Sequence, residues 1–471
     1  MRTSNAATLA VAILVTVGVT VGYAVDHHHS SPKPVAAPST TSSGSPMPLP
    51  SSAPPRLPVL GRLDPTVARP TAHGVTARLA SATGPVTSGA HLVGEVADAD
   101  TGAVLWARGA GVPEPPASTT KLLTAAAALD ALGPNFRLQT TTRLVARTVY
   151  LVGGGDPTVV RSDNGTAGQG YPAPASLATL ARRTAKALGT VRNVRLRLDA
   201  SAWSGPSMAR GWKPSYVTEG DITPPSALEL NEGRIDPSDE FASRSPTPAA
   251  QAGDVFVDLL RADGVHVIGK VALATAGAGS SPLASIESPP LSAMVENMLT
   301  VSDDDVAEAL GRAVARHDHV AATFTGAGQA VIARVASLGV PTTGVSLQDT
   351  SGLSHLDRIT PAALIGVLRA AISSRHPQLR AVVQGLPIAS LTGTLATRYT
   401  TKPAVKAAGV LRAKTGTLSG VNTLAGLVTD RSGRLLVFAF MASGAASPGL
   451  TVPALDNLAS RLAGCGCGGG A

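Results

Sequence analysis

The sequence predicts a mixed α/β (α+β) fold: an antiparallel sheet flanked by helices, an all-helical part and an inserted strand-rich region. Pairs of strand-like segments joined by short turn sequences predict β-hairpins at 91–110 and 420–443. Residues 288–384 carry a helical pattern, and 138–285 hold short strand-like pieces between turn-rich loops. The two hairpins lie far apart in the chain, with a strand-rich region and a helical region between them. This order indicates one domain built from two chain segments, with a second region inserted between them.

The first hairpin joins HLVGEVADAD to AVLWARGA through Thr101-Gly102, and a helix is expected from about Ser118 to Leu132. In the inserted region, the pieces expected to be strands are TTTRLVART, VRLRLDAS, GDVFVDLL and the start of LVGGGDPTVV, which ends in a glycine turn. The second hairpin joins GVNTLAGLVTD to RLLVFAFMAS, with LRAKTGTLSG as the neighbouring strand and a closing helix from about Pro453 to Leu462. These elements alternate in type along the chain, as a mixed fold requires.

Domain boundaries follow from these changes in pattern. The expected parts are 1–25 as membrane anchor or signal peptide, 26–88 as a Pro/Ser-rich linker and lead-in, 89–137 and 286–463 as the catalytic domain, 138–285 as inserted domain(s), and 464–471 as a Gly/Cys tail.

The composition limits the partners of the chain. It has 471 residues, 44% of them apolar, and a net charge of +8, which favours anionic partners. No basic block with interleaved aromatic residues is present, so nucleic acid is not an expected partner. The chain is long enough for two or three domains with sizeable cores.

The N-terminal run Ala6–Val25 contains 20 residues without a charge, a length that spans a bilayer as a helix. It is interpreted as an uncleaved anchor in the cytoplasmic membrane or as a secretory signal. Both interpretations place the rest of the chain outside the cytoplasm.

Metal and thiol chemistry have little support in the sequence. His27, His28 and His29 form one tripeptide, which cannot close a coordination sphere alone. The two cysteines, Cys465 and Cys467, lie in the tail, so the catalytic body has no cysteine nucleophile. A disulfide within the tail and a pairing with another chain both stay open.

Ser118 and Lys121 form the first candidate catalytic pair. They lie three residues apart at the start of an expected helix, so they share one helix face. A hydroxyl needs a neighbour to take its proton, and a neutral lysine amine can do so. The same spacing occurs at Ser30 and Lys33, but a proline interrupts it in the linker. A solvated helix lysine is the alternative interpretation of Lys121.

Two further segments carry suitable side chains. Lys414, Thr415, Gly416 and Thr417 lie on the strand before the second hairpin, where the lysine and hydroxyls can hold a carboxylate and the glycine allows close approach. An ordinary polar edge strand is the alternative.

Ser302-Asp303-Asp304 lies where a helix begins, and there the alternative is an N-cap serine followed by acidic residues.

These three elements, in this order, resemble the penicillin-binding proteins and serine β-lactamases. PASTTKLLTA and LRAKTGTLSG match most closely. LVGGGDPTVV, LELNEGRIDP, DTSGLS (349–354) and LTGTL (391–395) narrow the resemblance to the low-molecular-mass class C D-alanyl-D-alanine carboxypeptidases and endopeptidases. The resemblance covers about residues 90–463, and this family also inserts domains between its first two motifs.

The resemblance implies a mechanism and a penicillin-binding/β-lactamase-like fold. Ser118 would attack the bond between two D-alanines of a peptidoglycan stem peptide, with Lys121 as general base and Ser302 as a proton relay. The terminal carboxylate would be held by Lys414, Thr415 and Thr417, and the backbone N–H groups of Ser118 and Thr417 would form the oxyanion hole. β-Lactams would acylate the same serine, and no metal or organic cofactor is expected.

Asp304 departs from the family pattern, which has asparagine at this position. Asparagine donates and accepts hydrogen bonds, whereas ionised aspartate only accepts. A carboxylate beside Lys121 also favours the charged amine, which is a worse base. The hypothesis is that acylation is slower than in relatives with asparagine, or that Asp304 is protonated.

Two other functions stay open. One is a β-lactamase or esterase of the same fold, against which the long insertion argues. The other is a catalytically weak protein that binds the cell wall, which the basic charge and Asp304 allow.

Overall fold

The computed structural model describes residues 67–467 except 88, 163–170 and 445–447. All of these residues belong to one of the two units of the chain, Gly61–Ala471. The hypotheses about residues 1–25, the histidine triplet and Ser30/Lys33 therefore lie outside the described residues. Within the described part of the chain, no helix is both long and apolar enough to cross a membrane.

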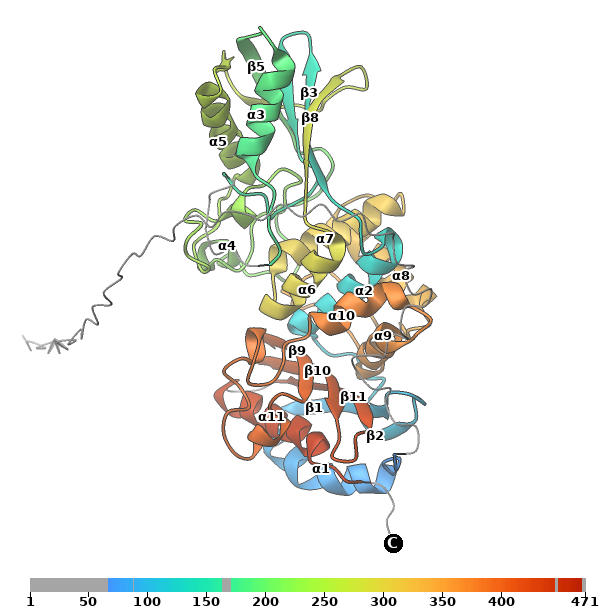
Figure 1. Cartoon of the computed structure of the whole chain (residues 1–471). Coiled ribbons are helices and arrows are strands. Elements are labelled where there is room, and N and C mark those ends of the chain that lie inside the picture. Colours follow the sequence, from blue (N-terminus) through green and yellow to red (C-terminus); the bar gives the residue numbers. More distant parts are fainter. Residues whose placement is uncertain (1–66, 88, 163–170, 445–447, 468–471) are drawn as a thin grey trace, which may run out of the picture. The chain divides into compact units, whose positions relative to one another are not determined.

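A five-stranded antiparallel sheet joins the two ends of the described chain. Its order is β2-β1-β11-β10-β9, so the first hairpin lies beside the C-terminal strands (Figure 1). The strands are β1 (His91–Asp98), β2 (Val104–Arg108), β9 (Leu411–Leu418), β10 (Val421–Thr429) and β11 (Leu435–Ser443). The antiparallel sheet and both hairpins expected from the sequence are confirmed.

Helices cover both faces of this sheet. Helices α1 (Ala72–Thr87) and α11 (Pro448–Ala463) share one hydrophobic core with one face. On the other face lies the all-helical part: α2 (Thr120–Leu132), α6 (Leu291–Val301), α7 (Asp304–His317), α8 (Phe324–Ser337), α9 (Pro361–Ile372) and α10 (Arg380–Gln384). The sequence predicted α11 to begin five residues later, and it did not predict α1, which lies in the lead-in segment.

The inserted region contains a second sheet of order β6-β5-β4-β3-β8, with β7 also paired to β5. Helices α3 (Leu177–Leu188) and α5 (Pro248–Ala262) share its core, and α4 (Tyr216–Glu219) is a short turn. The strands are β3 (Gln139–Val145), β4 (Thr148–Val152), β5 (Asn193–Asp199), β6 (His266–Val267), β7 (Ala272–Leu273) and β8 (Ser281–Glu287).

The prediction that GDVFVDLL forms a strand is wrong, because this segment lies inside α5. Ala252, Phe256 and Leu260 are buried at a spacing of four residues, which is the period of a helix face. Pro248 occupies the first helical turn, where a proline costs no hydrogen bond. The local Val-Phe-Val run suggested a strand, but the longer periodicity decides the structure.

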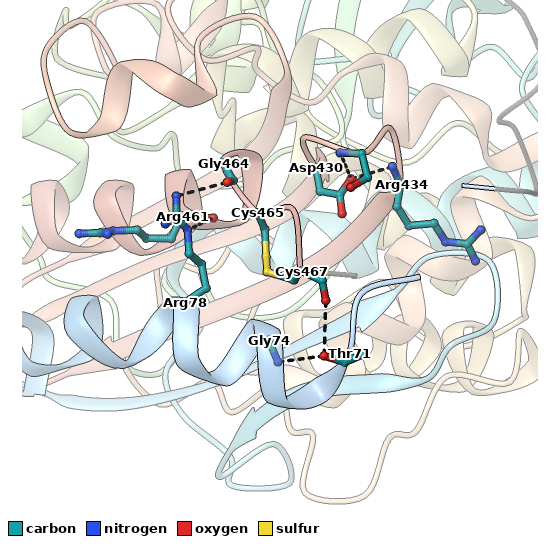
Figure 2. The surroundings of a disulfide bond; sticks show 10 residues. Thr71, Gly74, Arg78, Asp430, Arg434, Arg461, Gly464, Cys465 and Cys467 are labelled. Atoms are coloured by element: carbon teal, nitrogen blue, oxygen red, sulfur yellow. Dashed lines mark hydrogen bonds between the residues drawn. A yellow bond between two sulfur atoms is a disulfide. The ribbon is translucent and has the colours of Figure 1, made fainter. Parts of the chain in front are cut away.

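The C-terminal tail packs on α1. Cys465 and Cys467 form a disulfide, one of the two pairings left open by the sequence. The carbonyl oxygen of Cys467 accepts hydrogen bonds from the backbone N–H of Thr71 at 2.9 Å and from the Thr71 hydroxyl at 3.4 Å, the second of which is drawn in Figure 2. Gly74 faces this carbonyl so closely that a Cβ atom there would lie 2.8 Å from the oxygen. Cys467 therefore connects the last described residues to the start of α1.

We predict that Gly74→Ala destabilises the protein. The added methyl group must displace the tail, and overpacking of this kind costs about 1–3 kcal/mol of unfolding free energy. Gly84→Ala is the matched control in the same helix, because among the described residues a Cβ at that position has no atom within 4 Å. The control should change the unfolding free energy by less than about 1 kcal/mol. Equal denaturant midpoints for both variants would contradict this packing.

Candidate functional site

Ser118 lies in a short 3₁₀ turn, Ala117–Thr119, that leads into α2. Ala117 has a positive φ of 48°, an unusual conformation for a residue with a side chain. The hydroxyl of Thr119 donates to the carbonyl of Pro116 at 2.6 Å, and that of Thr120 donates to the carbonyl of Ala117 at 2.9 Å. These bonds fix the turn, which leaves the half-buried Ser118 hydroxyl facing Lys121.

Two glycines let other segments approach this turn. A Cβ on Gly352 would lie 2.0 Å from the carbonyl oxygen of Ala117, and one on Gly416 would lie 2.2 Å from the hydroxyl oxygen of Thr423 and 2.8 Å from the carbonyl oxygen of Pro116. From the sequence, Gly416 was expected to let the substrate backbone approach closely. In the structure, the missing side chain makes room for the turn that carries Ser118.

Lys121 is fully buried and its amine reaches three acceptors. The Nζ atom lies 3.0 Å from Ser118 Oγ and 2.5 Å from Asp304 Oδ1. The third acceptor is the carbonyl oxygen of Ser351, at 2.8 Å. The contact with Ser118 expected from their spacing is present, and the solvated-lysine interpretation is wrong. An ammonium has three donors, so this arrangement satisfies all of them.

Asp304 is the first residue of α7 and faces Lys121. Burial raises the pKa of Asp304 to about 6, although the nearby Lys121 opposes this shift. Its carboxyl group is therefore mostly ionised at neutral pH. The alternative in which Ser302 caps the helix is wrong, because the cap is Asp303, whose Oδ1 accepts from the N–H of Val306. Ser302 instead ends α6 with a positive φ of 71°.

Lys414 lies on β9 and is also fully buried. Its Nζ donates to Ser302 Oγ at 2.9 Å and to the carbonyl of Thr415 at 3.0 Å. Burial lowers the pKa of Lys414 well below its ordinary value, and the charge of Lys121 lowers it further. The structure thus brings the two lysines and Ser302 together, and Lys414 loses its proton more easily than a surface lysine.

The β9 motif, residues 414–417, extends from the buried Lys414 toward solvent. The hydroxyl oxygens of Thr415 and Thr394 lie 2.8 Å apart, and Thr417 is exposed near the end of the strand. Thr394 belongs to the LTGTL segment, which the sequence analysis noted without giving any of its residues a role.

The sequence analysis also missed the support of the Ser351 carbonyl. Residues 349–354 form a buried loop, and the Oε1 atom of Glu308 accepts the N–H groups of Thr350 at 2.8 Å and Ser351 at 2.9 Å. The other oxygen of Glu308 pairs with Arg312 Nη1 at 2.7 Å. Trp212 of the inserted region donates to Asp349 Oδ2 at 2.6 Å. Glu308 therefore positions the loop that contacts Lys121.

We predict that Glu308→Ala lowers the unfolding free energy by about 3–5 kcal/mol, because it leaves the buried charge of Arg312 without its carboxylate. The same change should slow any reaction of Ser118, since the Ser351 carbonyl is no longer held. Glu240→Ala, at an exposed position, is the control and should stay within about 0.5 kcal/mol of the wild type. A loss below about 1 kcal/mol for Glu308→Ala would contradict this role.

Comparisons with known proteins agree with this geometry. The profile of the D-Ala-D-Ala carboxypeptidase 3 (S13) family matches residues 76–241 and 238–462. A carboxypeptidase DacB of Mycolicibacterium smegmatis is 40% identical over 427 residues, covering 90% of each chain. A D-alanyl-D-alanine carboxypeptidase of an Actinomadura species is 28% identical over 451 residues, covering 78% of this chain and 80% of the relative.

The crystal structure of penicillin-binding protein 4 from Haemophilus influenzae has the same fold, with a TM-score of 0.67 and 21% identity. The match covers 82% of this chain and 99% of that one. The resemblance inferred from the sequence motifs is confirmed. The chain belongs to the D-Ala-D-Ala carboxypeptidase 3 (S13) family, with the fold of the penicillin-binding proteins.

Proposed function

We propose that this chain is a serine D-alanyl-D-alanine carboxypeptidase that removes the terminal D-alanine from peptidoglycan stem peptides through an acyl-enzyme on Ser118. Family membership supports the reaction class. The observation that carries the assignment of residues is the distance of 3.0 Å between Lys121 Nζ and Ser118 Oγ at a fixed, half-buried turn. β-Lactams acylate the same hydroxyl.

Acylation requires that Ser118 lose its proton as Oγ attacks the carbonyl carbon. Lys121 can take this proton only as a neutral amine, and the Asp304 carboxylate 2.5 Å away works against that form because it stabilises the ammonium. The oxygen of the attacked carbonyl becomes negative, and the backbone N–H groups of Ser118 and Thr417 stabilise it. Asp304 therefore decides how readily Lys121 becomes a base.

Expulsion of D-alanine requires a proton on the leaving nitrogen. Ser302 supplies this proton and recovers it from Lys414, with which it shares a hydrogen bond of 2.9 Å. The lowered pKa of Lys414 suits it to this exchange. The terminal carboxylate of the substrate binds near Lys414, Thr415 and Thr417, and its negative charge favours the protonated form of the lysine. Water then hydrolyses the ester on Ser118.

Peptidoglycan places this reaction outside the cytoplasm. Residues 6–25 serve as a membrane anchor or as a secretory signal in this proposal, which accounts for their uncharged composition. The positive net charge of +8 suits a surface that faces anionic cell-wall polymers.

We predict that Ser118→Ala abolishes labelling by a fluorescent penicillin and lowers D-alanine release from a stem peptide by a factor on the order of 10³ or more. Ser238→Ala, at an exposed position of the inserted region, is the control and should behave as the wild type. Cross-linked muropeptides in the same assay reveal any endopeptidase activity. Retained labelling and release in folded Ser118→Ala would refute the proposal.

We predict that Asp304→Asn speeds acylation by β-lactams. The substitution keeps an acceptor for Lys121 but removes the charge that stabilises its ammonium. A hydrogen bond to a charged group is worth about 1.5–3 kcal/mol, so the second-order rate constant should rise about tenfold or more.

Asp239→Asn, at an exposed position, is the control for loss of one carboxylate, and stopped-flow acylation is the measurement. An unchanged or lower rate in Asp304→Asn would show that the carboxylate does not restrain Lys121.

A further inference from the structure

A second group of carboxylates lies beside the site. Glu232 belongs to a 3₁₀ turn of the inserted region, Asn231–Gly233, while Asp303 and Asp305 flank Asp304 at the start of α7. One carboxylate oxygen from each of Glu232, Asp303 and Asp305 lies within 4.8 Å of the others. This spacing allows three oxygens to contact one ion. The family resemblance implied no metal, and nothing in the sequence alone places Glu232 beside Asp303 and Asp305.

Each of the three carboxylates has one oxygen in a local bond. Asp303 Oδ1 accepts from the N–H of Val306, Asp305 Oδ1 accepts from the N–H of Thr223 at 2.9 Å, and Glu232 Oε2 pairs with Arg234 at 2.6 Å. These bonds fix the carboxylates and leave the second oxygen of each for another partner.

Asp305 Oδ2 shows that such a partner is needed. Asp305 is 6% exposed, and among the described residues its Oδ2 atom has no hydrogen-bond donor. The Arg244 guanidinium lies 3.7 Å away, which is too far for a hydrogen bond. A buried carboxylate oxygen without a donor is costly.

Glu229 gives an independent indication. It is 4% exposed, and within the described structure its Oε1 atom also lacks a donor. It lies three residues before Glu232 in the chain, close enough for the charges of Asp305 and Glu232 to act on its carboxyl group. Among the described residues, Arg234 Nη1 pairs with Glu232 Oε2 at 2.6 Å, and Arg244 Nη1 lies 3.8 Å from Glu232 Oε2 and 3.7 Å from Asp305 Oδ2.

We propose that Glu232, Asp303 and Asp305 bind a hard divalent cation, Ca²⁺ or Mg²⁺, with Glu229 as a further carboxylate at its side. An all-oxygen ligand set is the one these ions prefer. The ion joins the inserted region to the helix start that carries Asp304. It thereby holds the insertion against the site, a role that does not depend on the chemistry of Ser118.

The test is isothermal titration of the full chain, treated with EDTA and dialysed, with CaCl₂ and MgCl₂ in separate runs. We expect one saturable site for at least one ion, and thermal unfolding at a higher temperature in its presence. Glu232→Gln and Asp303→Asn should weaken binding at least about tenfold, and asparagine keeps the helix cap at position 303. Asp254→Asn, at an exposed position of α5, is the control and should bind as the wild type.

The proposal is overturned if the wild type shows no saturable binding up to about 10 mM of either ion, above the range of weak extracellular calcium sites. It is also overturned if folded Glu232→Gln and Asp303→Asn bind as tightly as the wild type. Should a variant fail to fold by circular dichroism, the wild-type titration alone decides. Binding by Ser118→Ala separates this result from the peptidase proposal, because that variant keeps all of the carboxylates.

Discussion

The buried ammonium group of Lys121 is the interaction on which the site depends. Its three acceptors come from three separate segments: the turn before α2, the start of α7 and the loop 349–354. A buried charge must be paired and hydrogen-bonded, so these segments cannot move apart without a large cost in free energy. The need to satisfy one lysine therefore fixes the position of Ser118 relative to the rest of the fold.

The surroundings of Lys121 distribute charge over a small buried volume. Lys414 lies close enough for the charge of Lys121 to lower its pKa, and Asp304 partly offsets that effect. Behind the loop 349–354, Glu308 and Arg312 form a second buried ion pair. Only 2% of each side chain is exposed. Burial of so many charges costs stability, and it is typical of sites where groups must exchange protons. The charged groups lie on helices α2 and α7 on one side and on the edge strand β9 on the other.

Much of this arrangement could be predicted from the sequence because it depends on local spacing. Residues three apart at a helix start must share a face, so the contact between Ser118 and Lys121 follows from the chain itself. The hairpin strands are short, mostly apolar segments separated by turn residues, and Lys414–Thr417 lie on the strand beside the second hairpin. The contact of Asp304 with Lys121 came from the family pattern, since residues 183 apart have no local signal.

The remaining features could not be predicted, for physical reasons. The carbonyl of Ser351 is a backbone group, and any residue could supply it. The support by Glu308 and the cluster around Asp305 join residues that only tertiary packing brings together. The segment GDVFVDLL was misassigned because its local β-branched residues outweighed the four-residue period of its buried face. Helix α1 was missed because its stabilising partners, α11 and the tail, lie at the other end of the chain.

The acylation rate of Lys121→Met tests the central claim most directly. Methionine fills the space of the lysine stem without an amine, and intact-mass spectrometry follows the addition of a β-lactam to Ser118 with time. Lys186→Met, at an exposed position of α3, is the control. If Lys121 is the proton acceptor, the rate should fall by a factor of about 10²–10⁴ while the control keeps the wild-type rate. A folded Lys121→Met protein that acylates as fast as the wild type would contradict this account.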